Sequence, residues 1–183
     1  MRKRREKSYC DILKACPGDA RGILEVNYRA WLDSYPSEDH GITVDDIEDR
    51  FKSSFTKEEL KRREELIRDS SDGLIRLVAK KDQEIVGFIN VEVGEEGNRL
   101  SAIYIMPNRQ RKGLGQLLWE EANKYLDPKK RTVVHVASYN SKAIDFYKKL
   151  GFEETGRVWK DERFKMKSGN SFPLTELILP PKV

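Results

Sequence analysis

Hydrophobic positions along this chain recur with two periods, and each change of period marks a predicted element. Strand-like runs cover residues 9–14, 74–79, 84–93, 99–106, 131–137, 154–166 and 172–179. Helix-like runs cover residues 19–35, 43–68, 113–125 and 141–150. The order is a strand, two or three helices, three strands, a helix, a strand, a helix and two strands. That order predicts a single α/β domain with a sheet of about seven strands.

Local signals indicate where several of these elements begin and end. Thr43 and Asp46 have the spacing of a capping box, although Asp is a shorter partner than the usual Glu. The helical pattern that follows is expected to break near Ser53-Ser54, and the short connection 80–83 predicts a β-hairpin. The helix opened by Gly113 is expected to place a set of apolar side chains on one face: Leu114, Leu117, Leu118, Ala122 and Tyr125.

The composition fits one folded domain. The chain has 183 residues, of which 38% are hydrophobic and 36% are charged, so it can bury a core beneath a well solvated surface. Its longest apolar runs, such as residues 85–89, fall far short of the roughly 20 residues that span a bilayer. The charged N-terminus has no apolar segment behind it, so we expect neither a membrane span nor a secretory signal.

The formal net charge of +4 comes from the N-terminus alone, because residues 1–7 hold five basic side chains and one acidic one. We therefore expect a basic and mobile arm over residues 1–7, followed by a single domain over residues 8–183. The remaining chain carries 30 basic and 30 acidic residues and has no electrostatic footprint for nucleic acid. A nucleic-acid-binding arm at Arg2–Arg5 stays open as a weaker alternative.

The cysteines and histidines do not have the spacing of a metal site. Cys10 and Cys16 lie close together, whereas His40 and His135 are distant from them and from each other. We expect no metal, and a reduced cytoplasmic protein with two ordinary thiols, with one disulfide left open.

The segment 103–115 carries the clearest chemical signal, because a strand passes directly into a helix through glycines and cations. Unpaired amides in a first helical turn attract phosphate, Gly113 and Gly115 allow close approach, and Arg111 and Lys112 add positive charge. The P-loop pattern is absent, and the dinucleotide fingerprint lacks its third glycine, where Leu118 stands. Taken alone, the segment also fits a plain surface loop.

Two motifs together resemble a known family. Gln110-x-x-Gly113-x-Gly115 follows a strand, and Asn140-x-x-Ala143-x-x-Phe146-Tyr147-x-x-x-Gly151-Phe152 lies about 25 residues further on. With the hairpin 81–88, they resemble the GNAT superfamily of acyl-CoA N-acetyltransferases. The resemblance covers residues 74–153, and the N-terminal helical stretch and the Asn140 segment look most like polyamine acetyltransferases of the PaiA type.

The resemblance implies a mixed, mainly antiparallel sheet flanked by helices, whose central parallel strands 99–106 and 131–137 splay apart. Acetyl-CoA would bind there as cosubstrate, with its pyrophosphate on amides 111–116, its pantetheine along Tyr104–Met106 and its thioester carbonyl on an amide near Ile105. The cofactor-binding positions that it implies are Tyr104, Ile105, Met106, Gln110, Arg111, Lys112, Gly113, Leu114, Gly115, Gln116 and Asn140. Tyr147 corresponds to the tyrosine that protonates the departing thiolate.

Tyr147 and Asn140 can also be interpreted as structural residues. Tyr147 has helical spacing from Ile144 and Leu150, so it would also fit a core position. Asn140 could cap the helix that begins at Ser141, with or without touching the cofactor.

The base that accepts the proton of the substrate amine is not identified. Many members of the family place a glutamate near the start of the strand 99–106, but Arg99 and Ser101 stand at the corresponding positions. A water chain or a carboxylate such as Glu92 would be the substitute.

The negative charge of one segment suggests which kind of amine accepts the acetyl group. Residues 33–49 contain seven carboxylates and no Lys or Arg, and in this fold the segment between the first helices walls the acceptor site. We therefore expect Glu38 and Asp39 to attract a cationic acceptor and Trp31 and Tyr35 to add cation–π contacts. The alternative is that the first-turn carboxylates only stabilise a helix and that Trp31 belongs to the core.

These residues favour transfer of an acetyl group to a primary amine, with a polyamine such as spermidine or spermine as acceptor. The first alternative is acetylation of a protein N-terminus or a lysine, as RimI-like enzymes do. The second is an acyl-CoA-binding module without turnover. The expected partner is thus a small-molecule amine, with no nucleic acid or membrane, and a homodimer is left open.

Overall fold

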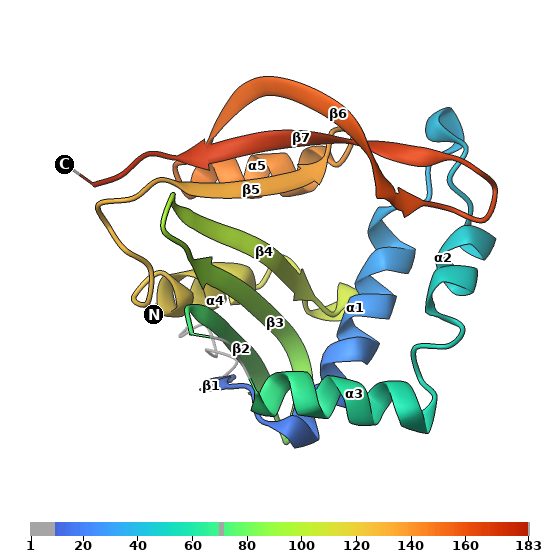
Figure 1. Ribbon diagram of the computed structural model, residues 1–183, viewed down its shortest axis with the longest axis horizontal. Coiled ribbons are helices and arrows are strands. Elements are labelled where there is room, and N and C mark those ends of the chain that lie inside the picture. The colour runs from blue at the N-terminus through green and yellow to red at the C-terminus, as the bar shows by residue number, and fades with distance from the viewer. Residues whose placement is uncertain (1–9, 70–71, 183) are drawn as a thin grey trace, which may run out of the picture.

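The computed structural model describes residues 10–69 and 72–182, so the predicted basic arm lies outside the described residues. One seven-stranded sheet has the order β1-β2-β3-β4-β5-β7-β6 (Figure 1). Its strands are β1 Asp11–Lys14, β2 Leu74–Lys81, β3 Glu84–Val93, β4 Asn98–Ile105, β5 Thr132–Ala137, β6 Glu153–Lys165 and β7 Ser171–Leu179. The helices are α1 Ala20–Ser34, α2 Val44–Phe51, α3 Lys57–Arg68, α4 Leu114–Ala122 and α5 Ser141–Lys149. The expected α/β domain and its sheet are confirmed.

The pair β4–β5 is the parallel pair of this sheet, and it separates along its length. The two strands pair at three positions, Asn98 with Thr132, Arg99 with Val133 and Leu100 with Val134. Beyond Leu100, β4 stays paired with β3, and β5 stays paired with β7. The predicted splay is therefore present, and it leaves one edge of β4 without a strand partner in the described chain (Figure 1).

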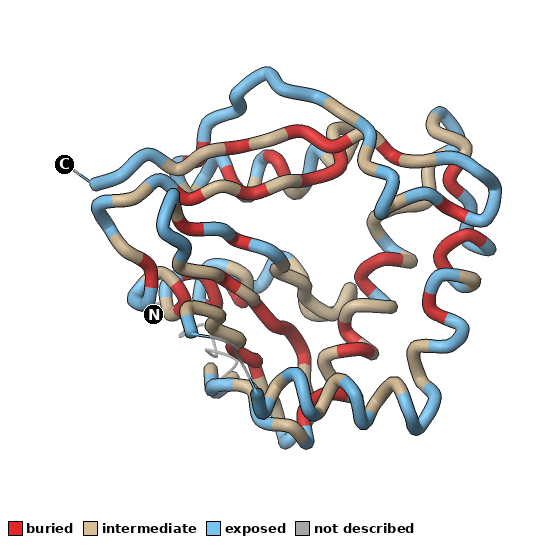
Figure 2. The backbone as a smooth tube through the Cα atoms, in the orientation of Figure 1, coloured by how far each residue is buried: buried red, intermediate tan, exposed pale blue. Residues whose placement is uncertain are grey.

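Helices cover both faces of the sheet. The larger core lies between the sheet and helices α4 and α5, and it includes Leu118, Trp119 and Ile144. The second core gathers α1 and α2 with the ends of β5, β6 and β7 around Leu24, Trp31 and Phe172. Figure 2 shows the buried positions along the central strands and on the inner sides of the helices. Residues of β2, β3, β4, β5 and β7 all contribute to the larger core, so this core continues across the splay.

The capping box, the helix break and the hairpin predicted from local signals are confirmed. Thr43 and Asp46 form the capping box, and the helical pattern breaks after Phe51, with Thr56 capping α3. The β2–β3 hairpin turns through Asp82 and Gln83, and both residues have positive φ. A two-residue turn needs positive φ at both positions if its twist is to match that of the strands.

The inward face predicted for α4 is wrong at two positions. Leu117 is 46% exposed, and Tyr125 lies beyond the end of the helix and is 38% exposed. Leu114, Leu118 and Ala122 follow the i, i+4 spacing, and Trp119 widens this face on the side away from Leu117. The larger ring takes the buried position, so Leu117 points to solvent.

Three further observations concern the composition. Cys10 and Cys16 are both free thiols. Within residues 10–69 and 72–182, no group of three or more His, Cys, Asp or Glu side chains could hold a metal ion. In the same residues, no helix is long and apolar enough to cross a membrane.

Candidate active site

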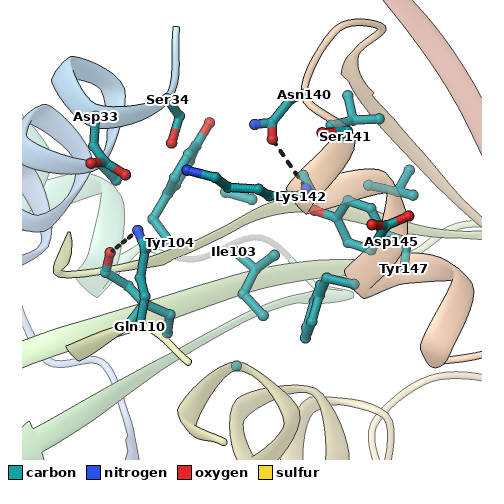
Figure 3. A pocket seen from close by; sticks show the side chains of 18 of the residues that line it. Asp33, Ser34, Ile103, Tyr104, Gln110, Asn140, Ser141, Lys142, Asp145 and Tyr147 are labelled. Carbon is teal, nitrogen blue, oxygen red and sulfur yellow. Dashed lines mark hydrogen bonds between the residues drawn. The ribbon is translucent and has the colours of Figure 1, made fainter. Parts of the chain in front are cut away.

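A cavity of about 890 Å³ opens where β4 and β5 separate. Its floor is formed by residues 100–105 of β4 and 134–136 of β5. The C-terminal end of α1 and the turn after β4 lie on one side of the cavity and α5 lies on the other (Figure 3), and the start of α4 also lines it. The cavity therefore joins the glycine-rich turn to the acidic segment that follows α1.

The turn between β4 and α4 presents backbone donors to this cavity. Arg111 has φ 59° and Gly113 has φ 82°, and Gly113 is the N-cap of α4 without a side-chain capping bond. None of the amides of residues 111–116 donates a hydrogen bond to the described part of the chain. Such a concave run of free amides at a helix N-terminus is an anion site. The coenzyme A pyrophosphate is an anion that fits it.

Gly115 has a second, structural function. A Cβ atom built on Gly115 would lie 3.2 Å from Cε2 of Phe146 on α5. The missing side chain therefore lets α4 and α5 approach each other beside the cavity. The sequence indicated only the approach of a ligand at this position.

The open edge of β4 carries free peptide groups. Met106 donates its amide to the carbonyl of Val86 in β3, so strand alternation turns the peptide groups of Ile103 and Ile105 toward the splay. The carbonyl of Ile105 accepts a bond of 3.4 Å from Nε2 of Gln110. Met106 does not line the cavity, because it packs against the separate core cluster of Val26, Val78 and Phe88. Lys112 does not line it either, and its ammonium bonds the carbonyl of Asn108.

Tyr147 projects from α5 into the cavity wall (Figure 3). Its ring is buried between Phe146 and Phe152, and its hydroxyl forms no hydrogen bond within the described part of the chain. Burial, with a smaller contribution from Tyr104, raises the pKa of the phenol above its ordinary value. The group is both a core residue and a protonated hydroxyl facing the cavity, so the two interpretations of Tyr147 are compatible.

Asn140 begins α5. Its Oδ1 accepts the amide of Ala143 at 3.0 Å, which is the predicted cap. Its Nδ2 has no partner among the described residues and faces the cavity. Asn140 can therefore cap the helix and donate to a ligand at the same time.

Three tyrosines meet beside the C-terminal end of α1. The hydroxyls of Tyr35 and Tyr104 lie 2.9 Å apart, and the hydroxyl of Tyr139 donates to the carbonyl of Tyr35 at 2.8 Å. Desolvation is the first cause that raises the pKa of each of the three phenols, to about 12 for Tyr139. They form a neutral polar wall around the end of β4.

The four residues expected to hold the acceptor are placed unevenly. Tyr35 lines the cavity, but its ring lies against Trp31 and Phe172, at 4.4 and 4.8 Å between centroids. Trp31 does not line the cavity, because it is buried in the second core and its ring is covered by the guanidinium of Arg50 at 5.0 Å. The expected cation–π contact of Trp31 is therefore made within the chain.

The carboxylates of residues 33–49 are also divided. Asp33 lines the cavity from the last turn of α1. Glu38 and Asp39 are exposed in the 3-10 turn that follows Ser37 and do not line it. Asp46 is a buried hydrogen-bond acceptor, and Asp49 pairs with Lys52. Glu92, the substitute base considered from the sequence, does not line the cavity.

The basic side chains of the wall come from other elements than α1. Arg109 and Arg111 come from the turn after β4, and Lys142 and Lys149 come from α5. Figure 3 shows Lys142 extending from α5 across the cavity toward Asp33 and Ser34.

Lys142, Tyr139 and His135 were missed as site residues by sequence reasoning. Lys142 and Tyr139 flank Asn140, so the motif itself was the signal for them.

A family model for the acetyltransferase (GNAT) domain matches residues 33–167, so the chain belongs to this family of acetyl-CoA-dependent acetyltransferases. The peptidyl-lysine N-acetyltransferase YjaB of Salmonella typhimurium is 35% identical over 118 residues, which are 64% of this chain and 73% of that protein. The spermidine N(1)-acetyltransferase of Thermoplasma acidophilum is 28% identical over 149 residues, which are 78% of this chain and 88% of that protein.

Solved acetyltransferase structures share this fold. The crystal structure of the PaiA N-acetyltransferase from Thermoplasma acidophilum in complex with coenzyme A superposes with a TM-score of 0.66 at 22% identity, covering 92% of this chain and 98% of that one. The expected superfamily is thus confirmed, while relatives that act on different amines match the chain comparably well.

Proposed function

We propose that this acetyltransferase moves the acetyl group of acetyl-CoA directly to a primary amine, and that a polyamine such as spermidine or spermine is the favoured acceptor. The observation that carries the acceptor class is Asp33, a carboxylate in the acceptor end of the cavity with no ion-pair partner in the described chain. A second ammonium group of the acceptor would pair with it. Glu38 and Asp39, exposed in the adjacent turn, would add to the attraction.

In this proposal the amides of residues 111–116 bind the pyrophosphate, and the free edge at Ile103 and Ile105 pairs with the pantetheine arm. The neutral amine attacks the thioester carbon, a C–N bond forms and the C–S bond breaks. Tyr147 gives its proton to the departing thiolate and regains one from the new amide nitrogen. The hydroxyl of Tyr147 is protonated at neutral pH, as a proton donor must be, since burial raises its pKa above the ordinary value of a phenol.

A lysine side chain or a protein N-terminus is the alternative acceptor, and the likeness to a peptidyl-lysine acetyltransferase favours it. The experiment that separates them measures thiol release from acetyl-CoA with spermidine, spermine, diamines, lysine peptides and peptides with free α-amines, compared by kcat/KM. The highest value with a polyamine supports the proposal, and the highest value with a peptide overturns it. Coenzyme A binding without turnover on any amine would instead indicate an acyl-CoA-binding module.

Two free thiols and the demand for acetyl-CoA favour the cytoplasm as the place of action.

Asp33→Asn should raise KM for spermidine about fivefold to tenfold and leave kcat within about twofold, because an exposed ion pair contributes about 1 kcal/mol to binding. KM for a monoamine should change less. Glu48→Gln is the matched control, since it removes another exposed carboxylate of the segment outside the cavity. An unchanged spermidine KM in Asp33→Asn would remove the support for the polyamine.

Gly113→Ala should raise KM for acetyl-CoA about tenfold, because a residue with a Cβ avoids φ 82° and relaxation of the turn would rotate the free amides away from the pyrophosphate. Gly156→Ala is the control. Gly156 also has a positive φ and open space around a built Cβ, but it lies in β6 away from the cavity. Both variants should lose about 1 kcal/mol of stability, and a KM that rises equally in both would contradict the assignment.

A further inference from the structure

His135 lies at the point where the two parallel strands separate. Leu100 and Val134 are the last paired residues of β4 and β5, and His135 is the next residue of β5. Its side chain is 24% exposed, and the residue lines the cavity. The imidazole is therefore within the cavity wall at the start of the splay.

The face of the sheet on which His135 lies is set by alternation. Val134 and Val136 pack into the core with α4 and α5. Ala137 belongs to the second core, with α1 and α2, so His135, two residues before it, is on that same face. Tyr104 of β4 also packs into this core. His135 thus faces the acceptor side, whereas Tyr147 approaches from the opposite face.

Glu176 orients the imidazole. Residue 176 of β7 is directly opposite His135, and its Oε2 lies 3.2 Å from Nε2 of the ring. Trp159 packs against the ring at 4.7 Å between centroids and 85° between planes. With Nε2–H donating to Glu176, Nδ1 carries a lone pair, and it has no hydrogen-bond partner in the described part of the chain.

The charges around His135 come from three strands. Glu176 on β7 also lies 3.7 Å from Arg157 of β6, and Arg99 of β4 and Asp161 of β6 act at longer range. Burial is the largest cause and lowers the pKa of His135, and Arg99 and Arg157 add to the decrease against the opposing effect of Glu176. The imidazole is consequently neutral at pH 7 and free to accept a proton.

Other proton acceptors of the cavity wall are less well placed. Asp33 and Asp145 are exposed carboxylates on α1 and α5, away from the paired start of the splay. On β4, the residues near the strand start are Arg99 and Ser101, and the serine hydroxyl donates to the carbonyl of Asn90. The tyrosine phenols of the acceptor end are protonated at neutral pH because their pKa values are raised.

We propose that His135 is the catalytic base of the transfer, with Glu176 as its positioning residue. Nδ1 takes one proton from the bound alkylammonium, directly or through one water molecule, and the neutral amine attacks the thioester. The imidazolium, stabilised by Glu176, later releases that proton to solvent. The second nitrogen proton replaces the one that Tyr147 gives to the thiolate, so the net products are the amide, the free thiol and one proton. The inference rests on the proposed function.

The pH dependence of kcat/KM tests the inference. In the wild type, log kcat/KM should rise with pH up to the pKa of His135 and then level off. In His135→Gln, kcat/KM at pH 7 should fall about 10²- to 10³-fold. The remaining activity should rise with unit slope toward the pKa of the amine, about 10.4, because only amine that is already neutral then reacts.

Two matched variants accompany this measurement. Glu176→Gln keeps a hydrogen-bonding side chain but removes the charge that raises the pKa of His135. The rise of kcat/KM on the acid side of the pH profile, its acid limb, should therefore move to lower pH, with a smaller loss of activity than in His135→Gln. His40→Gln changes the other histidine of the sequence, which bonds Ser37 and does not line the cavity, and it should keep the acid limb of the wild type. Coenzyme A affinity and melting temperature separate a folding defect from a catalytic one.

An NMR titration of His135 in the wild-type complex with coenzyme A gives an answer that does not depend on folding of the variant. Its pKa should coincide with the acid limb of kcat/KM. An acid limb that survives in His135→Gln, or a titration that does not match it, would overturn the inference while turnover still supports the acetyltransferase. Absence of wild-type turnover on any amine would instead overturn the proposed function itself.

Discussion

Tyr147→Phe should lower kcat about 10²- to 10⁴-fold, with the dissociation constant of acetyl-CoA changed by less than about twofold. The substitution removes a single hydroxyl, which has no partner in the described chain and faces the cavity. The ring keeps its contacts with Phe146 and Phe152, at 5.4 and 5.7 Å between centroids. Loss of the proton donor therefore acts on the departing thiolate rather than on the fold or on cofactor binding.

The measurement is steady-state turnover together with calorimetric titration of coenzyme A. Tyr125→Phe is the matched control, because Tyr125 is exposed, lies after α4 and does not line the cavity. It should keep wild-type kcat. Burial raises the pKa of Tyr147, so wild-type kcat should show no loss from ionisation of this phenol between pH 7 and about 10. Full turnover of Tyr147→Phe would exclude the hydroxyl as the proton donor.

Element boundaries were largely predictable because period and capping residues act within a few positions of the chain. The strand over β3 and the capping box at Thr43 depend only on neighbours in sequence. Leu117 shows the limit. Whether Leu117 or Trp119 faces the sheet depends on the space left by the strands beneath α4, and that space is fixed by residues far away in the sequence.

The turn with free amides after β4 was predictable for the same reason. Gln110–Gln116 form one continuous turn, so their residue types alone indicate an anion site. Other parts of the cavity wall are assembled from residues that are far apart in the sequence. Tyr35 and Tyr104 are 69 residues apart, and His135 and Glu176 are 41 apart, so neither pair has a local signal. Register across β5 and β7 creates the second pair.

The acidic segment 33–49 shows why charge counted along a sequence overestimates an electrostatic surface. Of its carboxylates, Asp33 reaches the cavity, whereas Asp46 and Asp49 are used by partners in the chain. Trp31 was expected to contact an external cation but contacts Arg50. Residue type was read correctly in these cases, but each side chain already has a partner within the chain.

Asp46 links the start of α2 to the β6–β7 hairpin. Besides the capping box with Thr43, its carboxylate accepts the backbone amide of Ser168 at 2.8 Å and the Ser168 hydroxyl at 3.0 Å. Next to it, Nδ2 of Asn170 donates to the carbonyl of Gly41 at 2.9 Å. Asp46→Ala removes the acceptor of four partly buried hydrogen bonds, two from Thr43 and two from Ser168. It should lower the free energy of unfolding by about 3 kcal/mol and the melting temperature by about 6 to 12 °C.

The control is Asp45→Ala, the same change at an exposed neighbour, which should cost no more than about 0.5 kcal/mol. Burial alone would raise the pKa of Asp46, but the bonds from Thr43 and Ser168 hold it below 3.8. The stabilisation is therefore complete above the unfolded pKa and is lost as pH falls through the folded one. Urea unfolding should show a stability gap between wild type and Asp46→Asn that is full at pH 7 and narrows below about pH 4. A gap that stayed constant with pH would show that the charge of Asp46 does not hold the hairpin against α2.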